Sequence, residues 1–316
     1  MSSLIPQATL ATLANSPQPW LVGVSGGGDS TALLHLLIAA GLQNRIHVGT
    51  FNHAWSNFGP QSVAFVKSLC EAHSIPFHTA TGNGKSETNA EESARTERYT
   101  WMKSLCETQS LAGVIVAHNQ DDIAESFLMR AGKGSGLSGL AAMRESSHYQ
   151  GLPILRPLLN TSRAALRDYL IAQNQNWLED PDNTLAISQR ARIRQLLPQL
   201  EAVGIRTEAL AASAQALAQA EDALHTAALN IPITATNGTV TLARATLINL
   251  QPELAARTIA RTIHAAVPGT QNTLMVRRSK RIALAERICT EPTGASTLHG
   301  AKFVWTESQL TVTPEK

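Results

Sequence analysis

The sequence predicts an α/β fold, with a doubly wound, mainly parallel five-stranded sheet and a smaller, mainly helical C-terminal region. Two observations predict it. Up to about residue 160, short apolar runs rich in β-branched residues alternate with longer segments of helical periodicity, the pattern of parallel strands joined by right-handed helical crossovers. Three consecutive glycines follow the first apolar run and precede a helix-forming segment, a turn at which α/β sheets bind ligands.

Strands and helices are expected to alternate along the first half of the chain. The strands are expected at residues 19–25, 45–53, 75–82, 113–118 and 152–159. The helices between them are expected at residues 30–41, 61–73, 89–107 and 119–130. Gly41 is placed to end the first helix, because glycine readily adopts the left-handed conformation that commonly follows a helix. The glycine-rich segment 131–140 is expected to be a loop.

Beyond residue 160 the pattern changes to helices at 161–173, 186–200 and 207–228, followed by short strands mixed with two further helices. We therefore expect two domains, residues 1–185 and residues 186–316. The first carries 12 Lys and Arg against 15 Asp and Glu, a net charge of −3, and the second carries 14 against 9, a net charge of +5. A basic C-terminal domain suits a polyanionic partner, and a solvated basic surface is the alternative.

The composition narrows the class of protein. Apolar residues make up 43% of the chain and charged residues 16%, as in ordinary folded proteins. No segment approaches the roughly 20 apolar residues that span a bilayer, and the N-terminus lacks the features of a signal peptide. Cys70, Cys106 and Cys289 form no Cys-x-x-Cys pair, which disfavours a disulfide framework or a zinc site. A cytoplasmic protein without a membrane partner is expected.

The turn after the first strand has the chemistry of a phosphate site. It reads Ser25-Gly26-Gly27-Gly28-Asp29-Ser30, and glycines let the backbone approach a ligand while the following helix directs unpaired N–H groups at an anion. The hydroxyls of Ser25 and Ser30 can donate to phosphate oxygens, and Asp29 suits Mg²⁺ that neutralises a polyphosphate. The motif matches neither a Walker loop nor a Rossmann fingerprint. A tight turn without a ligand is the alternative.

Further candidate residues follow the later strands. Asn52, His53 and His118 lie at strand ends, where doubly wound sheets bind ligands. Asp122 and Glu125 are about one turn apart on the next helix. The adjacent carboxylates Asp121 and Asp122 can serve as a general base, a metal site or a helix cap.

Arginines supply the positive charge that a phosphate site needs. Arg95 shares a helix face with Glu92 and Tyr99 and can bind a polyphosphate or form a surface ion pair. Arg190 and Arg194 share a face of the basic helix, and a later helix carries Arg277 and Arg278. These four residues are candidates for contact with a phosphate backbone.

The motifs taken together resemble the tRNA(Ile)-lysidine synthase family, within the N-type ATP pyrophosphatase (PP-loop) superfamily. The resemblance covers residues 19–200 and rests on SGGGDS, FNHAW, AEESARTERY, AHNQDDIAES, GKGSGLSGL, RPLL, WLEDPDNT and QRARIRQLLP. It implies an adenine nucleotide alpha-hydrolase-like fold. The family usually has Asp-His-Gly-Leu-Arg after the second strand, where this chain has Asn52-His53-Ala54-Trp55-Ser56. Two milder departures are Ser126, where Thr is usual, and Asp182, where Ser is usual.

The resemblance implies an ATP-dependent ligase that acts on isoleucine tRNA with a CAU anticodon. ATP would adenylate the wobble cytidine, free L-lysine would displace AMP from C2, and codon specificity would change from AUG to AUA. A homodimer is a further expectation.

Each candidate residue has an expected role in this chemistry. The glycine loop with Ser25 and Ser30 would bind ATP, and Asp29 would hold Mg²⁺. Arg95 would steady the phosphates, His118 would bind the nucleotide or base, and Asp122 would take the proton from lysine with support from Glu125. Arg190 would face tRNA or the reactive phosphate, and the tRNA contacts would come from Arg190, Arg194, Arg277 and Arg278.

Two other classes of function remain open from the residues alone. Within the superfamily these are tRNA thiolation, GMP synthesis or NAD synthesis, although the cysteines lie away from every motif and no glutaminase domain is evident. Outside it, a non-catalytic RNA-binding protein would use ATP as a structural ligand.

Overall fold

The computed structural model describes residues 4–55, 58–84, 90–179, 188–267, 269 and 277–315. These residues form two compact units. The first contains the chain up to Ser135 together with Gly139–Ala216, and the second contains Gly136–Ser138 and the chain from Leu217 onward.

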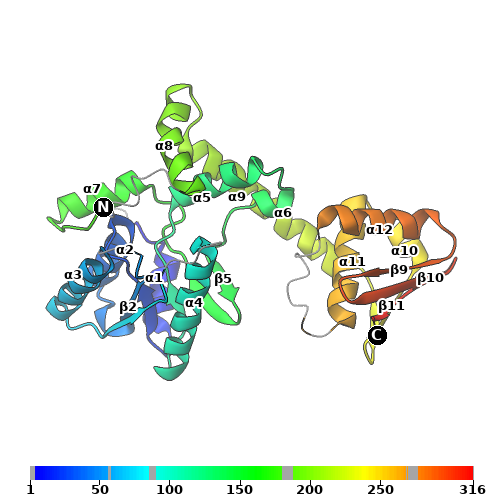
Figure 1. The fold of residues 1–316 in the computed structure, drawn as a ribbon, viewed down its shortest axis with the longest axis horizontal. Helices are drawn as coiled ribbons and strands as arrows, with labels where there is room; N and C mark the ends of the chain where they lie inside the picture. Colours follow the sequence, from blue (N-terminus) through cyan, green and yellow to red (C-terminus); the bar gives the residue numbers. More distant parts are fainter. Residues whose placement is uncertain are drawn as a thin grey trace. The chain divides into compact units, whose positions relative to one another are not determined.

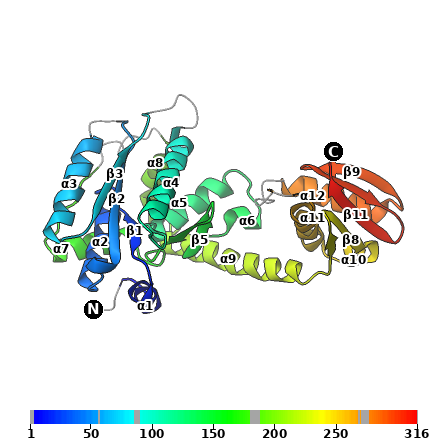
Figure 2. The same ribbon diagram turned by 90° about the horizontal axis from the view of Figure 1, so that it is seen from below.

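The first unit is built on one six-stranded sheet with the order β3-β2-β1-β4-β6-β5, labelled in Figures 1 and 2. Its strands are β1 (Trp20–Gly23), β2 (Ile46–Asn52), β3 (Phe77–Thr81), β4 (Val114–Ile115), β5 (Ser146–Tyr149) and β6 (Leu152–Leu155). Neighbouring strands are parallel except at the edge, where β5 is antiparallel to β6. The predicted doubly wound, mainly parallel sheet is therefore confirmed.

The helices of this unit cover both faces of the sheet. They are α1 (Gln7–Asn15), α2 (Gly28–Ala39), the 3-10 turn η1 (Gln43–Arg45), α3 (Phe58–Ala72), α4 (Ala90–Thr108), α5 (Gln120–Ala131), α7 (Arg163–Ala172) and α8 (Gln189–Ala202). The short α6 (Leu137–Leu140) and the long α9 (Thr207–Leu229) cross the boundary between the units. Gly41 follows α2 with φ +75°, as predicted for a residue that ends a helix.

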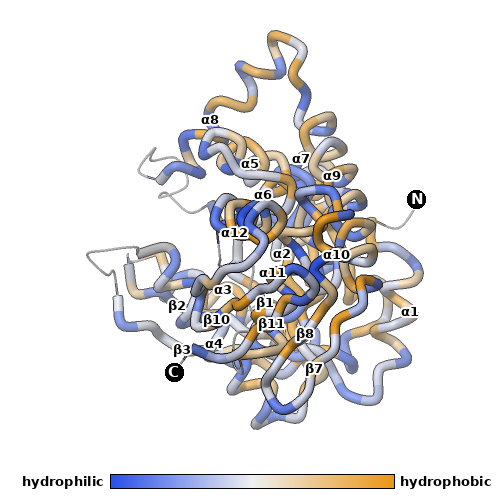
Figure 3. Tube along the Cα trace, turned by 90° about the vertical axis from the view of Figure 1, so that its right-hand side faces the viewer, coloured by the Kyte–Doolittle hydropathy of each residue, from blue (hydrophilic) through white to orange (hydrophobic). Residues whose placement is uncertain are grey.

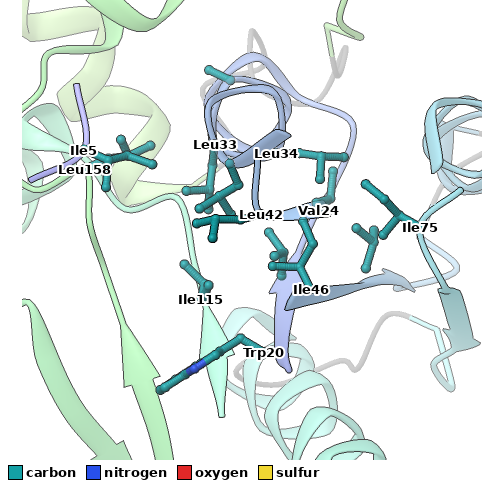
Figure 4. Close-up of a cluster of buried hydrophobic side chains, with 14 of the residues drawn as sticks. Ile5, Trp20, Val24, Leu33, Leu34, Leu42, Ile46, Ile75, Ile115 and Leu158 are labelled. Atoms are coloured by element: carbon teal, nitrogen blue, oxygen red, sulfur yellow. The ribbon is translucent and has the colours of Figure 1, made fainter. Parts of the chain in front are cut away.

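Alternate residues of β1 belong to different cores. Val22 is buried with Leu33 and Leu34 of α2, and Figure 4 shows these leucines above Val24 and Ile46. The adjacent Leu21 points to the opposite face and packs in the cluster that contains Tyr99 of α4. The strand is thus buried on both faces, as expected in a parallel sheet covered by helices.

The second unit has its own antiparallel sheet, with the order β7-β8-β11-β10-β9. Its strands are β7 (Thr234–Thr236), β8 (Thr239–Ala243), β9 (Gly294–Leu298), β10 (Ala301–Trp305) and β11 (Gln309–Pro314), and its helices besides α9 are α10 (Arg244–Ile248), α11 (Pro252–Ala266) and α12 (Arg278–Thr290). Ile259, Ile263, Phe303 and Trp305 are buried in its core. Hydrophilic residues recur along the helices in Figure 3, and no helix in the described ranges is long and apolar enough to cross a membrane.

The structure differs from the sequence-based expectation in two respects. The sheet has six strands rather than five, because β5 has the polar sequence Ser-Ser-His-Tyr and no apolar alternation marks it. The C-terminal region has the expected helices, and its short strands join in one five-stranded sheet. The compact units divide at Ala216 rather than at residue 185, because α8 belongs to the first unit and packs against α5.

Candidate active site

The glycine loop is a sharply turned connection between β1 and α2. Gly26 has φ +80°, a conformation that residues with a Cβ rarely adopt. The Ser30 hydroxyl accepts from the Ser25 N–H at 3.1 Å and donates to the Gly27 carbonyl at 3.0 Å. From α3, the Ser62 hydroxyl donates to the Ser25 carbonyl at 2.5 Å. These bonds hold the turn in one conformation before any ligand arrives.

The loop leaves room for a ligand at the N-terminus of α2. Gly27 caps this helix without a side-chain hydrogen bond, so the first N–H groups are available to an anion, which the helix dipole also favours. A Cβ on Gly27 would meet only the Ser25 hydroxyl, at 3.5 Å. On the other side, the Leu178 N–H donates to the Gly26 carbonyl at 2.9 Å, which ties the segment after α7 to the loop.

The loop opens into a cavity of about 620 Å³ within the first unit. Its lining combines the glycine loop with basic, acidic and apolar side chains. The lining includes Ser25, Gly27, Gly28, Asp29, Ser30, Phe51, His53, Arg95, Arg98, Met102, Val116, His118, Asp122, Arg163, Arg190 and Arg194. The volume lies in the range of sites that enclose a small organic ligand.

Two carboxylates at the start of α5 face this cavity or lie directly beneath it. Asn119 caps the helix: its side chain accepts from the Asp122 N–H at 3.1 Å, and its own N–H donates to Asp122 Oδ2 at 3.0 Å. Asp122 is 8% exposed and Glu125 is fully buried. Capping was the alternative role for Asp122, and the structure shows that the residue does cap through Oδ2, while Oδ1 accepts from Arg163 and Arg190.

Three arginines surround the two carboxylates. Glu125 accepts from Arg190 Nε at 2.7 Å, from Arg194 Nε at 2.8 Å and from Arg163 Nη1 at 3.2 Å. Asp122 Oδ1 lies 3.3 Å from Arg163 Nη2 and 3.4 Å from Arg190 Nη2. Burying these charges is tolerated because each has several partners of opposite sign.

Arg163 connects this cluster to the glycine loop. Its Nε donates to Asp29 Oδ2 at 3.3 Å, and its backbone N–H donates to Asp121 at 2.8 Å. The predicted candidate residues did not include Arg163, although it contacts more of the acidic residues than any predicted arginine. Its sequence signal was weak, because an arginine after the N-cap Ser162 has the appearance of an ordinary helix start.

The two carboxylates of α5 have opposite pKa shifts. Burial raises the pKa of Asp122, against the opposing effect of Arg190. Burial also acts to raise the pKa of Glu125, but the hydrogen bond from Arg194 and the charges of Arg163 and Arg190 outweigh it and lower that pKa. Groups whose environments push their pKa values apart are candidates for separate acid–base roles. Asp122 is suited to exchange a proton, and Glu125 to remain an anion.

Two histidines, His53 and His118, also line the cavity. Burial, followed by the charges of Arg156 and Arg190, lowers the pKa of His118 to about 3. Burial, followed by Arg98, lowers that of His53 to about 4. The Nδ1 atoms of both rings are buried without a hydrogen-bond partner, so these polar atoms are available to a ligand. Arg95 also lines the cavity, with its guanidinium 4.7 Å from the Tyr99 ring centroid.

Most predicted site residues thus meet in one cavity. The cavity is lined by the glycine loop and by Asp29, Arg95, His118, Asp122, Arg190 and Arg194. Glu125 is fully buried and does not belong to the lining. Arg277 and Arg278 belong to the second unit, where Arg278 pairs with Glu253 at 2.7 Å. Asp182 and Ser56 lie outside the described residues.

One carboxylate of the cavity lining, that of Asp29, is suited to bind a divalent ion. Across the described ranges, no group of three or more His, Cys, Asp or Glu side chains could hold a metal alone. Asp29 is nevertheless 28% exposed at the edge of the glycine loop, and Mg²⁺ is commonly bound by one or two carboxylates with phosphates and water. The residues present fit Mg²⁺ that arrives with ATP rather than a permanent metal centre.

Comparison with known proteins identifies the class of this fold and site. A family model described as a PP-loop domain matches residues 4–200. The chain belongs to this PP-loop family.

Similarity to individual proteins is more specific than the match to the family model. The chain is 36% identical over 201 residues to the tRNA(Ile)-lysidine synthase of Ruegeria pomeroyi, covering 63% of this chain and 48% of that protein. It is 32% identical over 188 residues to the tRNA(Ile)-lysidine synthase of Chlamydia pneumoniae, covering 58% of each. The chain thus spans about half the length of the curated relatives it matches.

A solved structure supports the fold. The U34-tRNA thiolase NcsA of Methanococcus maripaludis aligns with a TM-score of 0.53 at 15% identity, over 69% of this chain and 78% of that one. At this identity the similarity extends to the fold alone.

Proposed function

We propose that this protein ligates free L-lysine to C2 of the wobble cytidine in isoleucine tRNA with a CAU anticodon, with ATP converted to AMP and pyrophosphate. One observation carries the proposal: a phosphate-binding loop and the carboxylate pair of Asp122 and Glu125 share one cavity, connected by Arg163. Adenylation needs the first, and deprotonation of an amine needs the second. The relatives named tRNA(Ile)-lysidine synthase support this choice of substrates.

The first step is adenylation of the base. The glycine loop and the N-terminus of α2 hold the phosphates of ATP, with Ser25 and Ser30 as hydroxyl donors. Cytidine O2 attacks the α-phosphorus, the bond to the β-phosphate breaks, and pyrophosphate leaves. Arg95 stabilises the negative charge that develops on the phosphates. Mg²⁺ held by Asp29 supplies further neutralisation when it is bound.

The second step is attack by lysine. The free ε-amine has a pKa near 10.4, so it must lose a proton before its nitrogen can bond to C2. Asp122 takes this proton, since its raised pKa makes it the more basic carboxylate of the pair. The new C2–N bond forms as the C2–O bond to AMP breaks. Glu125 holds Arg163, Arg190 and Arg194 in place, and His118 contacts the nucleotide or the base through its unpaired Nδ1.

The tRNA must present its cytidine out of the anticodon stack, as other base-modifying enzymes require. Arg190 and Arg194 face the cavity from α8 and can move from the carboxylates to an incoming phosphate. Arg277 and Arg278 of α12 contribute sequence-independent contacts from the second unit.

Sulfur transfer into tRNA is less well supported. Cys70 and Cys106 are buried, and burial raises the pKa of each thiol to about 12, which makes them poor nucleophiles near neutral pH. Cys289 belongs to the second unit and burial raises the pKa of its thiol as well.

Separating the two steps tests the proposal. The protein is incubated with ATP labelled at the α-phosphate and CAU tRNA without lysine, and label should transfer to tRNA with release of pyrophosphate. Adding lysine should then discharge the label as AMP, whereas ornithine and arginine should do so poorly. ATP binding without pyrophosphate release, in the presence of both tRNA and lysine, would favour the non-catalytic RNA-binding alternative.

A further inference from the structure

Aromatic rings from α4, β2 and the loop after β2 form a continuous series that ends where the family pattern has Asp-His-Gly-Leu-Arg. The ring centroids are 5.6 Å apart for Trp101 and Phe51, 4.9 Å for Phe51 and His53, and 5.6 Å for His53 and Trp55. These separations are those of interacting aromatic pairs. The four rings form a continuous ladder, which we call the aromatic ladder.

The aromatic ladder runs from the cavity wall to solvent. Phe51 and His53 line the cavity. Trp55 does not belong to that lining and is 36% exposed. A large, partly exposed aromatic side chain therefore lies outside the cavity lining and packs against His53, a ring that belongs to that lining.

The backbone holds Trp55 in this position. The Asn52 side-chain oxygen accepts from the Ala54 N–H at 2.8 Å, which closes a tight turn. Ala54 has φ +56°, a left-handed conformation that residues other than glycine seldom adopt. Such conformations are often retained at functional sites, and here the turn directs the next residue, Trp55, outward.

The surroundings of the ladder favour nucleic acid. Arg95 and Arg98 line the same cavity, and among the described residues neither guanidinium forms a hydrogen bond with a carboxylate. Burial, and the neighbouring charge of Arg95, lower the pKa of Arg98 against the effect of Tyr99. His53, with its pKa near 4, is neutral at physiological pH and suited to stacking. Basic residues beside aromatic rings are the recurring means of binding single-stranded RNA.

We propose that Trp55 stacks on the base next to the cytidine that enters the cavity, an inference that rests on the proposed function. When one base leaves the anticodon stack, its neighbour loses a stacking partner. Trp55 replaces that partner, and the ring of His53 beneath it keeps the indole in place. The occupant is a nucleobase of single-stranded RNA, because Trp55 lies outside the cavity that the phosphates of ATP would occupy.

Binding of an anticodon stem-loop tests this proposal without lysine or ATP. The stem-loop carries 2-aminopurine beside the CAU cytidine, and the fluorescence of this base is quenched when it stacks. We expect Trp55→Ala to weaken binding by about 5- to 100-fold and to leave the bound 2-aminopurine brighter than with the wild-type protein. Trp55→Phe should restore most of the affinity and the quenching. Ile171→Ala, at an exposed apolar position of α7, is the matched control and should change neither.

The remaining outcomes decide against the proposal. Unchanged binding and quenching in Trp55→Ala, or failure of the wild-type protein to bind the stem-loop, would overturn it. A loss of ATP affinity with unchanged RNA affinity would instead place Trp55 in the nucleotide site and would also overturn it. If Trp55→Ala alters RNA stacking but the wild-type protein incorporates no lysine, the stacking proposal stands and the proposed function fails. Melting temperatures of each variant exclude misfolding, and Trp55→Phe remains informative if the alanine variant is unstable.

Discussion

Asp122 and Glu125 lie about one helical turn apart, yet their surroundings act on them in opposite directions. Asp122 has one oxygen bound to the Asn119 backbone and the other near two arginines. Glu125 accepts hydrogen bonds from three arginines. The pKa of the first is raised and that of the second lowered, which suits the proposed roles of Asp122 as proton acceptor and of Glu125 as an anion that holds the arginines.

Asp122→Asn should therefore separate binding from chemistry. The amide keeps the size of the side chain but cannot take a proton, so lysine incorporation should fall by about 10²- to 10⁴-fold. ATP affinity, measured by equilibrium dialysis, should change little because the glycine loop is intact. Asp168→Asn, at an exposed position of α7, should behave like the wild-type protein. Undiminished incorporation by Asp122→Asn would remove this residue from the mechanism.

His118 should make the fold sensitive to acid. The folded protein keeps its imidazole neutral, with a pKa of about 3, whereas the unfolded chain takes up a proton below its ordinary pKa of about 6.5. Stability is present above pH 6.5 and is lost as the pH falls toward 3. Between pH 7 and pH 5 the wild-type protein should lose about 2 kcal/mol more free energy of unfolding than His118→Phe. Urea unfolding without ATP measures this, and equal losses would contradict the assignment.

The candidate residues could be predicted where their spacing along one strand or helix determines which side chains face a ligand. The glycine loop and the Asp122–Glu125 pair could be found because strand ends and helical turns fix which residues face a ligand. Arg163 could not, since its importance comes from tertiary contacts with Asp29 and α5 rather than from its neighbours in sequence. His53 could be placed at a strand end from the sequence, but its low pKa could not be predicted, because it depends on burial and on Arg98.

At the scale of elements, the connection between β1 and α2 depends on its glycines. Its conformation requires a left-handed residue at Gly26, and a Cβ there would lie 3.3 Å from the Ser62 hydroxyl. Elements predicted from strong periodicity, such as α2, α4 and α5, lie within a few residues of their expected ranges. The polar edge strand β5 and the short α1 carried no comparable signal.

Gly26→Ala tests this requirement against a matched substitution. Gly151 also has a left-handed φ, of +84°, but a Cβ there would meet nothing within 4 Å. Both alanine variants should lose about 1–2 kcal/mol of stability. Only Gly26→Ala should also lose ATP affinity, by about tenfold or more, which corresponds to about 1.4 kcal/mol. Isothermal titration with ATP measures the affinity, and urea unfolding measures the stability. A Gly26→Ala variant that binds ATP normally would show that the loop tolerates a side chain.

At the scale of the whole molecule, the two compact units differ in what they contribute. The first contains the entire cavity, and the second presents Arg277 and Lys280 as exposed cations at the start of α12. The sequence indicated a basic C-terminal part with short strands. Their pairing into one five-stranded sheet was not predictable, because it joins segments that lie far apart in the sequence.

Removing the charges of Arg277 and Lys280 should weaken tRNA binding without changing the affinity for ATP. In Arg277→Ala/Lys280→Ala, the plot of log affinity against log salt should become shallower by about 0.9 for each lost phosphate contact. Arg287→Ala is the control, since Arg287 lies on the same helix but pairs with Glu291 at 2.9 Å. Filter binding at several salt concentrations provides the measurement. An unchanged salt slope would exclude this end of α12 from the RNA surface.

The most direct test of the account is transfer of radiolabelled lysine to tRNA. Purified protein, ATP, Mg²⁺ and a CAU isoleucine tRNA transcript should yield acid-precipitable label equal to the pyrophosphate released. A transcript with the wobble cytidine replaced by uridine should yield none. If neither lysine incorporation nor pyrophosphate release occurs while ATP still binds and a known active enzyme succeeds beside it, the ligase account is contradicted.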